Sequence, residues 1–141
     1  MNISTPSDEL CERFNGLEWH DSKLRSFAVV RHDEDRDNVV LNLELRGISE
    51  RELTPATLTL EDATYLRADV DLDGKSECSD DISRAVCEIE SDLKKELLNS
   101  QFKYSPTALD GYYLFDIYLI PPGGRIQVFA KNFKVEQSPG R

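Results

Sequence analysis

The chain has few of the residues that build metal centres and nucleophilic sites. Its 141 residues include two histidines and three cysteines, and Cys11, Cys78 and Cys87 show no Cys-x-x-Cys spacing. A zinc site of the usual Cys/His kind is therefore not expected. An odd number of scattered cysteines favours free thiols and a reducing, cytoplasmic location.

Long apolar runs are absent as well. The longest, residues 112–120, is interrupted by Asp116 and is far shorter than the ~20 residues that a membrane-spanning helix needs. The first residues lack a basic segment followed by an apolar run, so no secretory leader is expected. With a hydrophobic content of 39%, these features indicate one soluble domain over residues 1–141, ordered from about residue 6 to 135.

Positive charge is scarce. Lys and Arg number 17 against 27 Asp and Glu, which gives a formal net charge of -10. A field of this sign disfavours nucleic acids and anionic membranes and favours basic proteins or metal ions, although it also serves solubility alone. Enzyme features are missing too: no glycine-rich loop precedes a helix, and no pattern of carboxylates indicates separated pKa values. We therefore expect a non-enzymatic protein.

Period-two alternation predicts an antiparallel sheet. The clearest case is residues 39–46, where Val39, Leu41, Leu43 and Leu45 share one face. Further strands are expected over residues 24–31, 56–72 with a bulge near Asp62, 112–120, and 125–135 with a bulge near Lys131 or Asn132. The strand over 112–120 is apolar on both faces, which is typical of a central strand.

Two helices complete the predicted α+β domain. A short helix is expected over residues 5–16, with Leu10 and Phe14 on its apolar side. A longer amphipathic helix is expected from residue 79 or 80 to Asn99, because apolar residues recur at helical spacing between positions 82 and 97. With about five strands, the expected architecture is a mostly antiparallel curved sheet, a half-barrel or small sandwich, closed by the longer helix.

Residues 65–74 join a predicted strand to a row of carboxylates. Leu66, Ala68, Val70 and Leu72 alternate with charged residues, so this face of the strand is expected in the core. The following stretch matches the spacing of a calcium-binding loop, with candidate ligands at Asp69, Asp71, Asp73, Lys75, Glu77 and Asp80. The stretch departs from the calcium-loop pattern in three ways. Its last candidate ligand is aspartate rather than glutamate, serine occupies a position that is usually apolar, and a strand rather than a helix precedes the loop. Alternation in an acidic strand end gives the same spacing, so both interpretations stay open.

The single tryptophan lies in the sequence Trp19-His20-Asp21-Ser22. A catalytic interpretation would pair His20 with Asp21 or Ser22. Adjacent residues of an extended chain point to opposite faces, however, and no third member of a catalytic triad is evident. We therefore expect a structural role, with Trp19 in the core and Asp21 or Ser22 bonding backbone N–H groups of a local turn.

This motif, followed by Leu24, resembles the N-terminal signature of small bacterial domains. A Tyr-Leu-Arg-x-Asp strand at 65–69, a Pro-Pro-Gly-Gly hairpin at 121–124 and an Ala-Lys-x-Phe strand at 130–133 are compatible with the same resemblance, which covers about residues 17–135. Such domains are similar to immunity proteins of polymorphic-toxin systems. The resemblance implies a bacterial, non-enzymatic binding domain and transfers no active site.

The function expected from the sequence is binding of a basic protein partner, such as a toxin. Complementary charge on an acidic surface would speed the encounter with such a partner. Five aspartates are candidates for the rim of the binding surface: Asp33, Asp35, Asp69, Asp71 and Asp73. The alternative is a calcium-binding module that uses residues 69–80.

Overall fold

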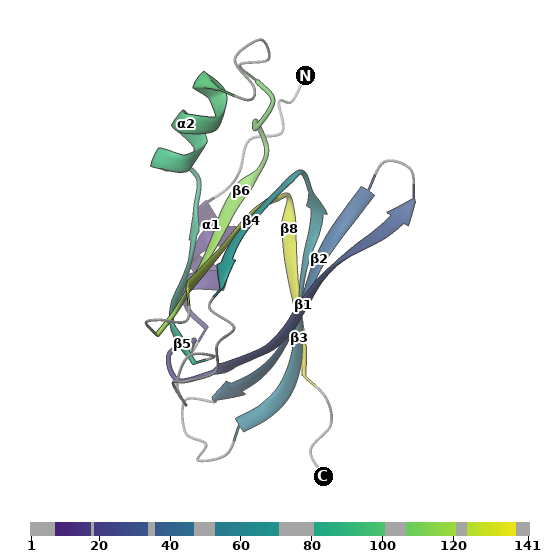
Figure 1. The fold of residues 1–141 in the computed structure, drawn as a ribbon, viewed down its shortest axis with the longest axis vertical. Helices are drawn as coiled ribbons and strands as arrows, with labels where there is room; N and C mark the ends of the chain where they lie inside the picture. The colour runs from purple at the N-terminus through teal and green to yellow at the C-terminus, as the bar shows by residue number, and fades with distance from the viewer. Residues whose placement is uncertain are drawn as a thin grey trace.

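The structure is a computed structural model that describes residues 8–17, 19–33, 36–46, 53–70, 81–100, 107–120 and 124–137. Over these residues the chain forms two helices and eight strands (Figure 1). They are α1 (Asp8–Asn15), β1 (Lys23–Asp33), β2 (Arg36–Arg46), β3 (Leu53–Ala63), β4 (Tyr65–Val70), β5 (Ile82–Glu88), α2 (Asp92–Asn99), β6 (Tyr113–Leu119), β7 (Gly124–Ala130) and β8 (Asn132–Gln137).

The eight strands form two antiparallel sheets of four strands each. The first sheet has the order β1-β2-β3-β8 and the second the order β4-β7-β6-β5. The α+β class and the antiparallel pairing are thereby confirmed. The predicted curved sheet of about five strands is imprecise, because eight strands form two sheets. Two predicted strands bend and contribute to both sheets, and the first half of the predicted long helix is a strand.

The two bends lie side by side and connect the sheets. β3 passes into β4 beyond Asp62, which has a positive φ of 54°, and β7 passes into β8 at Lys131. The Lys131 N–H donates to the Glu61 carbonyl and the Thr64 N–H to the Phe129 carbonyl, both at 2.9 Å. These bonds continue the ladder between the two long strands through the bend. The irregularities predicted near Asp62 and Lys131 are confirmed.

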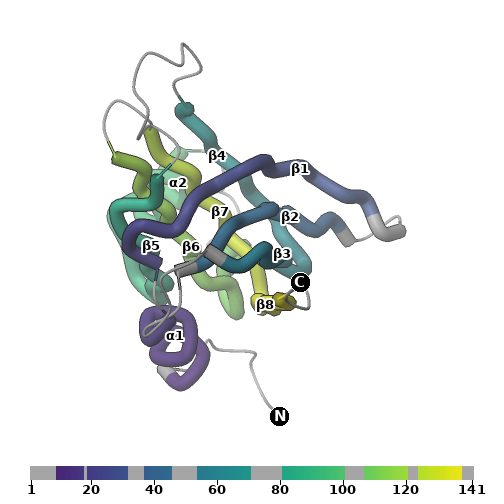
Figure 2. The backbone as a smooth tube through the Cα atoms, turned by 90° about the horizontal axis from the view of Figure 1, so that it is seen from below, coloured from purple at the N-terminus to yellow at the C-terminus, as the bar shows by residue number. Residues whose placement is uncertain are grey.

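The strands β1 and β5 also meet, at their first residues. Lys23 forms an antiparallel bridge with Asp81, and the Ile82 N–H donates to the Ser22 carbonyl at 2.6 Å. Figure 2 shows β1 starting beside β5 and then running along β2. Beyond its first residues, β1 therefore runs away from the second sheet.

The main hydrophobic core lies between the two sheets. The four alternating apolar residues of β2 are all buried, as predicted. α1 contributes the fully buried Phe14, whose ring centroid lies 4.7 Å from that of Trp19. Trp19 is 4% exposed, and its indole N–H donates to the Phe14 carbonyl at 2.8 Å. The short N-terminal helix and the core position of Trp19 are both confirmed.

The second sheet is buried on both faces over much of its area. Its central strand β6, placed between β7 and β5, has six of seven residues buried, as predicted for residues 112–120. The inner face of this sheet borders the main core. The outer face carries a second, smaller cluster that α2 covers, made of Leu93, Leu97, Leu109, Leu114 and Phe129.

The long helix predicted from residue 79 or 80 is wrong in its first half. Residues 82–88 form β5, and α2 begins after Ser91, whose Oγ accepts a hydrogen bond from the Lys94 N–H at 3.1 Å. A register shift between Ile82 and Arg84 moves the next buried residue to Ala85. Because a bulge breaks strict alternation, this strand imitates the three-residue spacing of a helix.

Other features of α2 agree with the sequence. The helix ends at Asn99, as predicted, and the Lys94 ammonium lies 3.1 Å from the Glu90 carboxylate, four residues earlier. Residues 79 and 80, where the helix was expected to begin, lie outside the described residues. Within the described ranges, neither helix has the length and apolar character needed to cross a membrane.

β4 is the edge strand of the second sheet, which limits its burial. Leu66 and Val70 are half-buried against the main core, but Ala68 is exposed. The prediction that this whole face lies in the core is therefore wrong at Ala68, because an edge strand is flanked on one side only. Leu72 lies outside the described residues.

Candidate functional site

The outer edge of β1 is an unpaired strand edge. β1 pairs with β2 from Lys23 to Asp33, and among the described residues its only other strand contact is the bridge to Asp81. Figure 1 shows the hairpin of β1 and β2 extending away from the second sheet. Beyond the bridge at Lys23, no strand among the described residues pairs with this edge.

The side chains at this edge are apolar on both faces. Val29 is 53% exposed and Val30 is 44% exposed. They are two of the three large hydrophobic side chains that are exposed in the described part of the chain, the third being Leu17. Because adjacent strand residues point to opposite faces, one valine borders the inner face of the sheet and the other the outer face.

A hollow of about 210 Å³ lies beside Val29. Its walls come from the hairpin and from the bend between β3 and β4, and the residues that line it are Val29, Asp37, Val39, Ala63, Thr64, Tyr65 and Leu66. Most of these side chains are apolar. A side chain from an added strand could enter this hollow from the β1 edge.

Ion pairs neutralise the charged side chains on either side of the valines. The Arg25 guanidinium binds both carboxylate oxygens of Glu44, at 2.9 Å and 3.0 Å, and thereby lowers the pKa of Glu44. Arg31 binds Asp37 in the same way, with Nε to Oδ1 at 3.0 Å. The edge therefore presents an apolar centre between two internally paired charges.

The motif around Trp19 forms a turn in which two exposed side chains meet. His20 and Asp21 were expected to point apart, and this is wrong, since His20 Nδ1 lies 3.3 Å from Asp21 Oδ2. Asp21 adopts a φ of 67° in a turn rather than an extended conformation, which brings the two exposed side chains together. Ser22 is fully buried, and the turn is bound through backbone groups, with the Ser22 N–H donating to the Trp19 carbonyl at 3.0 Å.

The acidic candidates are placed only in part. Asp69 is exposed on β4 and Asp33 ends β1, whereas Asp35, Asp71, Asp73, Lys75, Glu77 and Asp80 lie outside the described residues. Within the described ranges, no group of three or more His, Cys, Asp or Glu side chains could hold a metal ion. The calcium loop at residues 69–80 stays a prediction that no described contact favours.

Sequence reasoning missed a buried polar cluster on the outer face of the second sheet. Asp116 is 2% exposed and accepts two hydrogen bonds from Arg125, at 2.9 Å and 2.7 Å. Tyr118 and Gln127 also donate to Asp116, and the Arg84 and Arg125 guanidiniums lie 4.3 Å and 4.5 Å from the Tyr118 ring centroid. The bond to Asp116 raises the pKa of Arg125. The available signal was one aspartate inside the most apolar strand of the chain.

Two cysteines that are distant in sequence lie in contact. Cys11 on α1 is half-buried and Cys87 on β5 is buried, and their sulfur atoms are 3.2 Å apart. Neither cysteine is in a disulfide, as predicted, while Cys78 lies outside the described residues. Burial raises the pKa of the Cys87 thiol.

Comparisons with protein-family models, with curated proteins and with solved structures give no match to this chain. The function is therefore argued from the surfaces of the chain itself. The resemblance to immunity proteins, the cytoplasmic location and the lack of enzymatic activity stay predictions.

Proposed function

We propose that the chain is a non-enzymatic protein-binding domain that takes an extended segment of a basic partner protein as an added strand on β1. The observation that carries this proposal is the pair of adjacent exposed valines, Val29 and Val30, on an unpaired strand edge. Such an edge offers backbone N–H and C=O groups to another chain. Natural proteins usually protect free edges with charges or proline, and this edge carries neither at its centre.

Strand addition also defines what the partner segment should look like. Backbone hydrogen bonds supply affinity without regard to sequence, and alternate side chains supply specificity. Side chains on the inner face would meet Val29 and the hollow beside it, so an apolar residue is favoured there. Side chains on the outer face would meet Val30. The preferred segment is therefore short, extended and apolar at its centre.

Charge favours basic residues in that partner. The chain carries a net charge of -10, which attracts a positively charged protein and speeds the encounter. Asp33 ends β1, which keeps it a candidate for the rim, and Asp35 stays a candidate that lies outside the described residues. A basic toxin is the kind of partner that the resemblance to immunity proteins implies.

The experiment is a screen of an array of short synthetic peptides for binding to the purified chain. The peptides combine an apolar centre with flanking lysine, neutral or glutamate residues. We expect peptides with lysine flanks to bind best and to lose affinity as the salt concentration rises. When a peptide binds, amide hydrogen exchange of the chain should become slower along β1.

Matched variants test the place of binding. The double change Val29→Lys and Val30→Lys puts charges on the docking edge and should abolish peptide binding. The control is the double change Thr57→Lys and Thr59→Lys on β3, an interior strand of the same sheet. If the β1 variant binds as the unchanged chain does, or if no peptide class binds the unchanged chain, the proposal is wrong.

A further inference from the structure

The two edge strands of the first sheet, β1 and β8, differ in their exposed side chains. At the centre of β1 these are Val29 and Val30, whereas the exposed residues of β8 include Lys134 and Glu136. Charged side chains protect a strand edge from pairing with another chain. Of the two edges of this sheet, β1 is therefore the one that lacks such protection at its centre.

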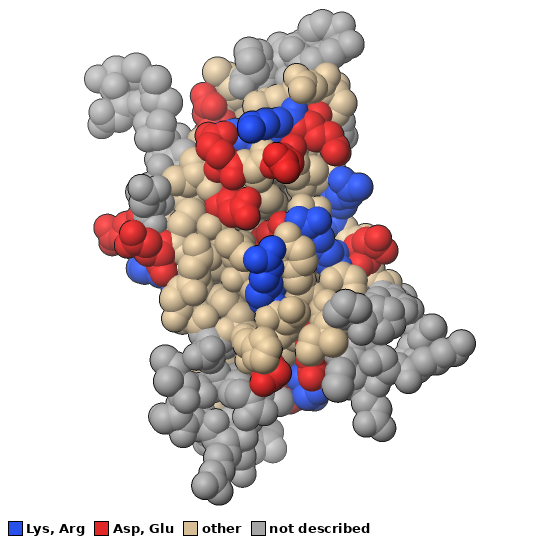
Figure 3. Space-filling view, turned by 90° about the vertical axis from the view of Figure 1, so that its left-hand side faces the viewer, with Lys and Arg blue, Asp and Glu red and all other residues tan. Residues whose placement is uncertain are grey.

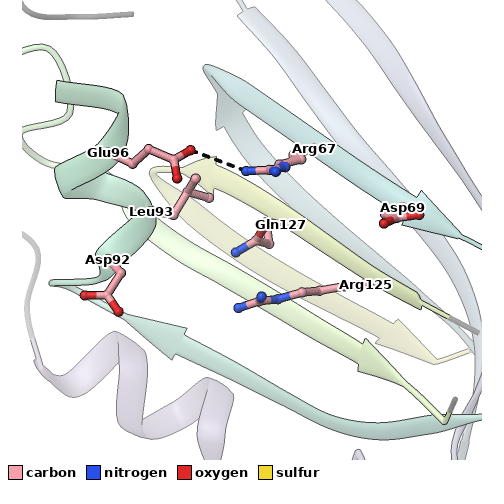
Figure 4. Close-up of a pocket in the computed structure, with 7 residues that line it drawn as sticks. All are labelled: Arg67, Asp69, Asp92, Leu93, Glu96, Arg125 and Gln127. Atoms are coloured by element: carbon pink, nitrogen blue, oxygen red, sulfur yellow. Dashed lines mark hydrogen bonds and ion pairs between the residues drawn. The ribbon is translucent and has the colours of Figure 1, made fainter. Parts of the chain in front are cut away.

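The outer face of the second sheet is polar, and its charges pair among themselves. Figure 3 shows acidic side chains gathered around α2 and basic ones over the middle of the sheet. A polar groove of about 340 Å³ lies beside α2, and Figure 4 shows its floor of β4 and β7 side chains. Arg125 binds Asp116 there, and Arg67 meets Glu96 at 3.5 Å. Burying hydrated charges that already have partners gains little, so this face suits a second copy of the chain less well than β1 does.

The order of residues along β1 suits pairing with a second copy of itself. Two copies of one strand pair antiparallel about a two-fold axis that keeps each face of the sheet on its own side, so opposite residues must share a face. With the axis at Val29, this residue meets its own copy, and Val30 meets Ala28. An axis at Ala28 would place Val30 opposite Ser26, and an axis at Val30 would place Val29 opposite Arg31. Of these three registers, only the first gives both valines an apolar neighbour.

The charges along β1 do not oppose this register. Arg31 binds Asp37 on the β2 strand of its own copy, and it would lie opposite Phe27 of the second copy, as a cation beside an aromatic ring. Arg25 is likewise bound to Glu44 within its own copy. The repulsion that remains is that between two chains of net charge -10, which acts over a longer range and is screened by salt.

We propose that two copies of the chain pair through their β1 strands, antiparallel about Val29, so that their four-stranded first sheets become one continuous sheet. A two-fold contact of this kind occupies the β1 edge of both copies and is closed, so it does not grow into a fibre. The inference rests on the docking edge of the proposed function and concerns its regulation. The paired edge is closed to a partner segment, and dilution or a competing segment opens it.

Sedimentation equilibrium of the full chain, over a range of protein concentrations at low and high salt, tests the dimer. We expect a reversible equilibrium of monomer and dimer that shifts toward the dimer as salt screens the repulsion. Binding of a lysine-flanked peptide should weaken with salt, so the two processes have opposite salt dependences. A monomer under all conditions, or species that grow beyond a dimer, would overturn the dimer. A monomer that still binds the peptide would leave strand addition standing.

Cysteine substitutions test the register, in a chain with Cys78→Ser. Val29→Cys should give a disulfide-linked dimer in oxidised glutathione, because antiparallel pairing brings opposite Cα atoms to about 5 Å. Ala28→Cys is the matched control. Each Ala28 lies two residues away from its copy along the strand, which separates the two Cα atoms by about 8 Å and prevents a disulfide. Faster linkage through Ala28→Cys than through Val29→Cys would overturn the register.

Lysine substitutions test the place of contact. Val29→Lys with Val30→Lys should abolish the dimer, because it puts charges at the centre of the edge. Leu17→Lys changes the third exposed hydrophobic residue, which lies outside β1, and should leave the dimer unchanged. Circular dichroism checks that both variants are folded. A dimer that survives the change on β1, or that is lost equally with Leu17→Lys, would overturn the proposal.

Discussion

The two faces of the second sheet come from the same strands and differ sharply. On the inner face, Phe115, Ile117, Ile126 and Val128 are buried against the first sheet. On the outer face, apolar residues lie under α2, but the positions beyond them are Asp116, Tyr118, Arg125 and Gln127. The inner face is wholly apolar, whereas the outer face changes from apolar to polar along each strand.

The difference follows from the size of the element that covers each face. A whole sheet covers the inner face. Among the described elements, α2 is the helix that covers the outer face, beside the turn that carries Leu109, and its eight residues span about 12 Å, whereas the seven residues of β6 span about 23 Å. The part of the outer face that the helix does not reach holds the hydrogen-bonded cluster around Asp116. A short covering helix thus creates the polar groove beside it.

The largest expected effect concerns the main core, which the inner face of the second sheet borders. Trp19→Ala should lower the free energy of unfolding by about 3–5 kcal/mol, because a large buried ring is lost from the main core. Denaturant unfolding measures this change. Trp19→Phe should cost less, since it keeps an aromatic ring beside Phe14. A Trp19→Ala chain with an unchanged midpoint would contradict the position assigned to Trp19.

A covalent link between Cys11 and Cys87 would tie α1 to the second sheet. Oxidised glutathione should produce it: the Cys11 thiolate attacks the glutathione disulfide, and Cys87 then displaces the bound glutathione from Cys11. Because burial raises the pKa of Cys87, the second step should be faster at alkaline pH. Closing the loop between Cys11 and Cys87 should raise the free energy of unfolding by up to about 4 kcal/mol.

Intact mass and thermal melting with and without a reductant measure this link, in a chain with Cys78→Ser to remove the third thiol. The control is Cys11→Ser, which should show neither the loss of two hydrogens nor the rise in melting temperature. A reducible rise that persists in the control would disprove the assigned pair.

A matched pair of leucine substitutions compares the two hydrophobic clusters directly. Leu97→Ala under α2 should cost about 2 kcal/mol, and Leu41→Ala in the main core about 4 kcal/mol. The cavity under α2 borders solvent and can relax by movement of a short helix, whereas the inter-sheet cavity cannot collapse easily. Equal losses in denaturant unfolding would show that the two clusters are equally rigid.

The smallest effect concerns the ion pair of Arg25 and Glu44 on the first sheet. Because the pKa of Glu44 is lowered in the folded chain, its contribution is present above the ordinary glutamate pKa and is lost as the pH falls through the lowered value. Glu44→Gln should therefore cost about 0.5 kcal/mol at neutral pH and less in acid. Unfolding curves over pH 3 to 7, at low and high salt, measure it. A loss that grows in acid would have the wrong sign.

The local sequence pattern was sufficient to predict the structure where a strand has one solvent-exposed face and one buried face. The hairpin of β1 and β2, the bulge near Asp62 and the inward residues of β2 all follow from alternation and from turn residues. The local pattern gave the wrong element at β5, because a bulge between Ile82 and Arg84 gave the buried residues of a strand the spacing of a helix. The free β1 edge and the polar groove have no local signal, since both depend on which neighbours are missing.

The amino-acid sequence by itself determined the α+β class, the antiparallel pairing, the N-terminal helix and the acidic character of the chain. These depend on side-chain period and on charge, which are local or additive properties. Only the tertiary structure decided that two strands bend into both sheets, that Cys11 meets Cys87 across 76 positions, and that Gln127 and Arg125 meet Asp116 on the outer face of the second sheet. Such features arise from contacts between distant segments, and no local pattern specifies which segments meet.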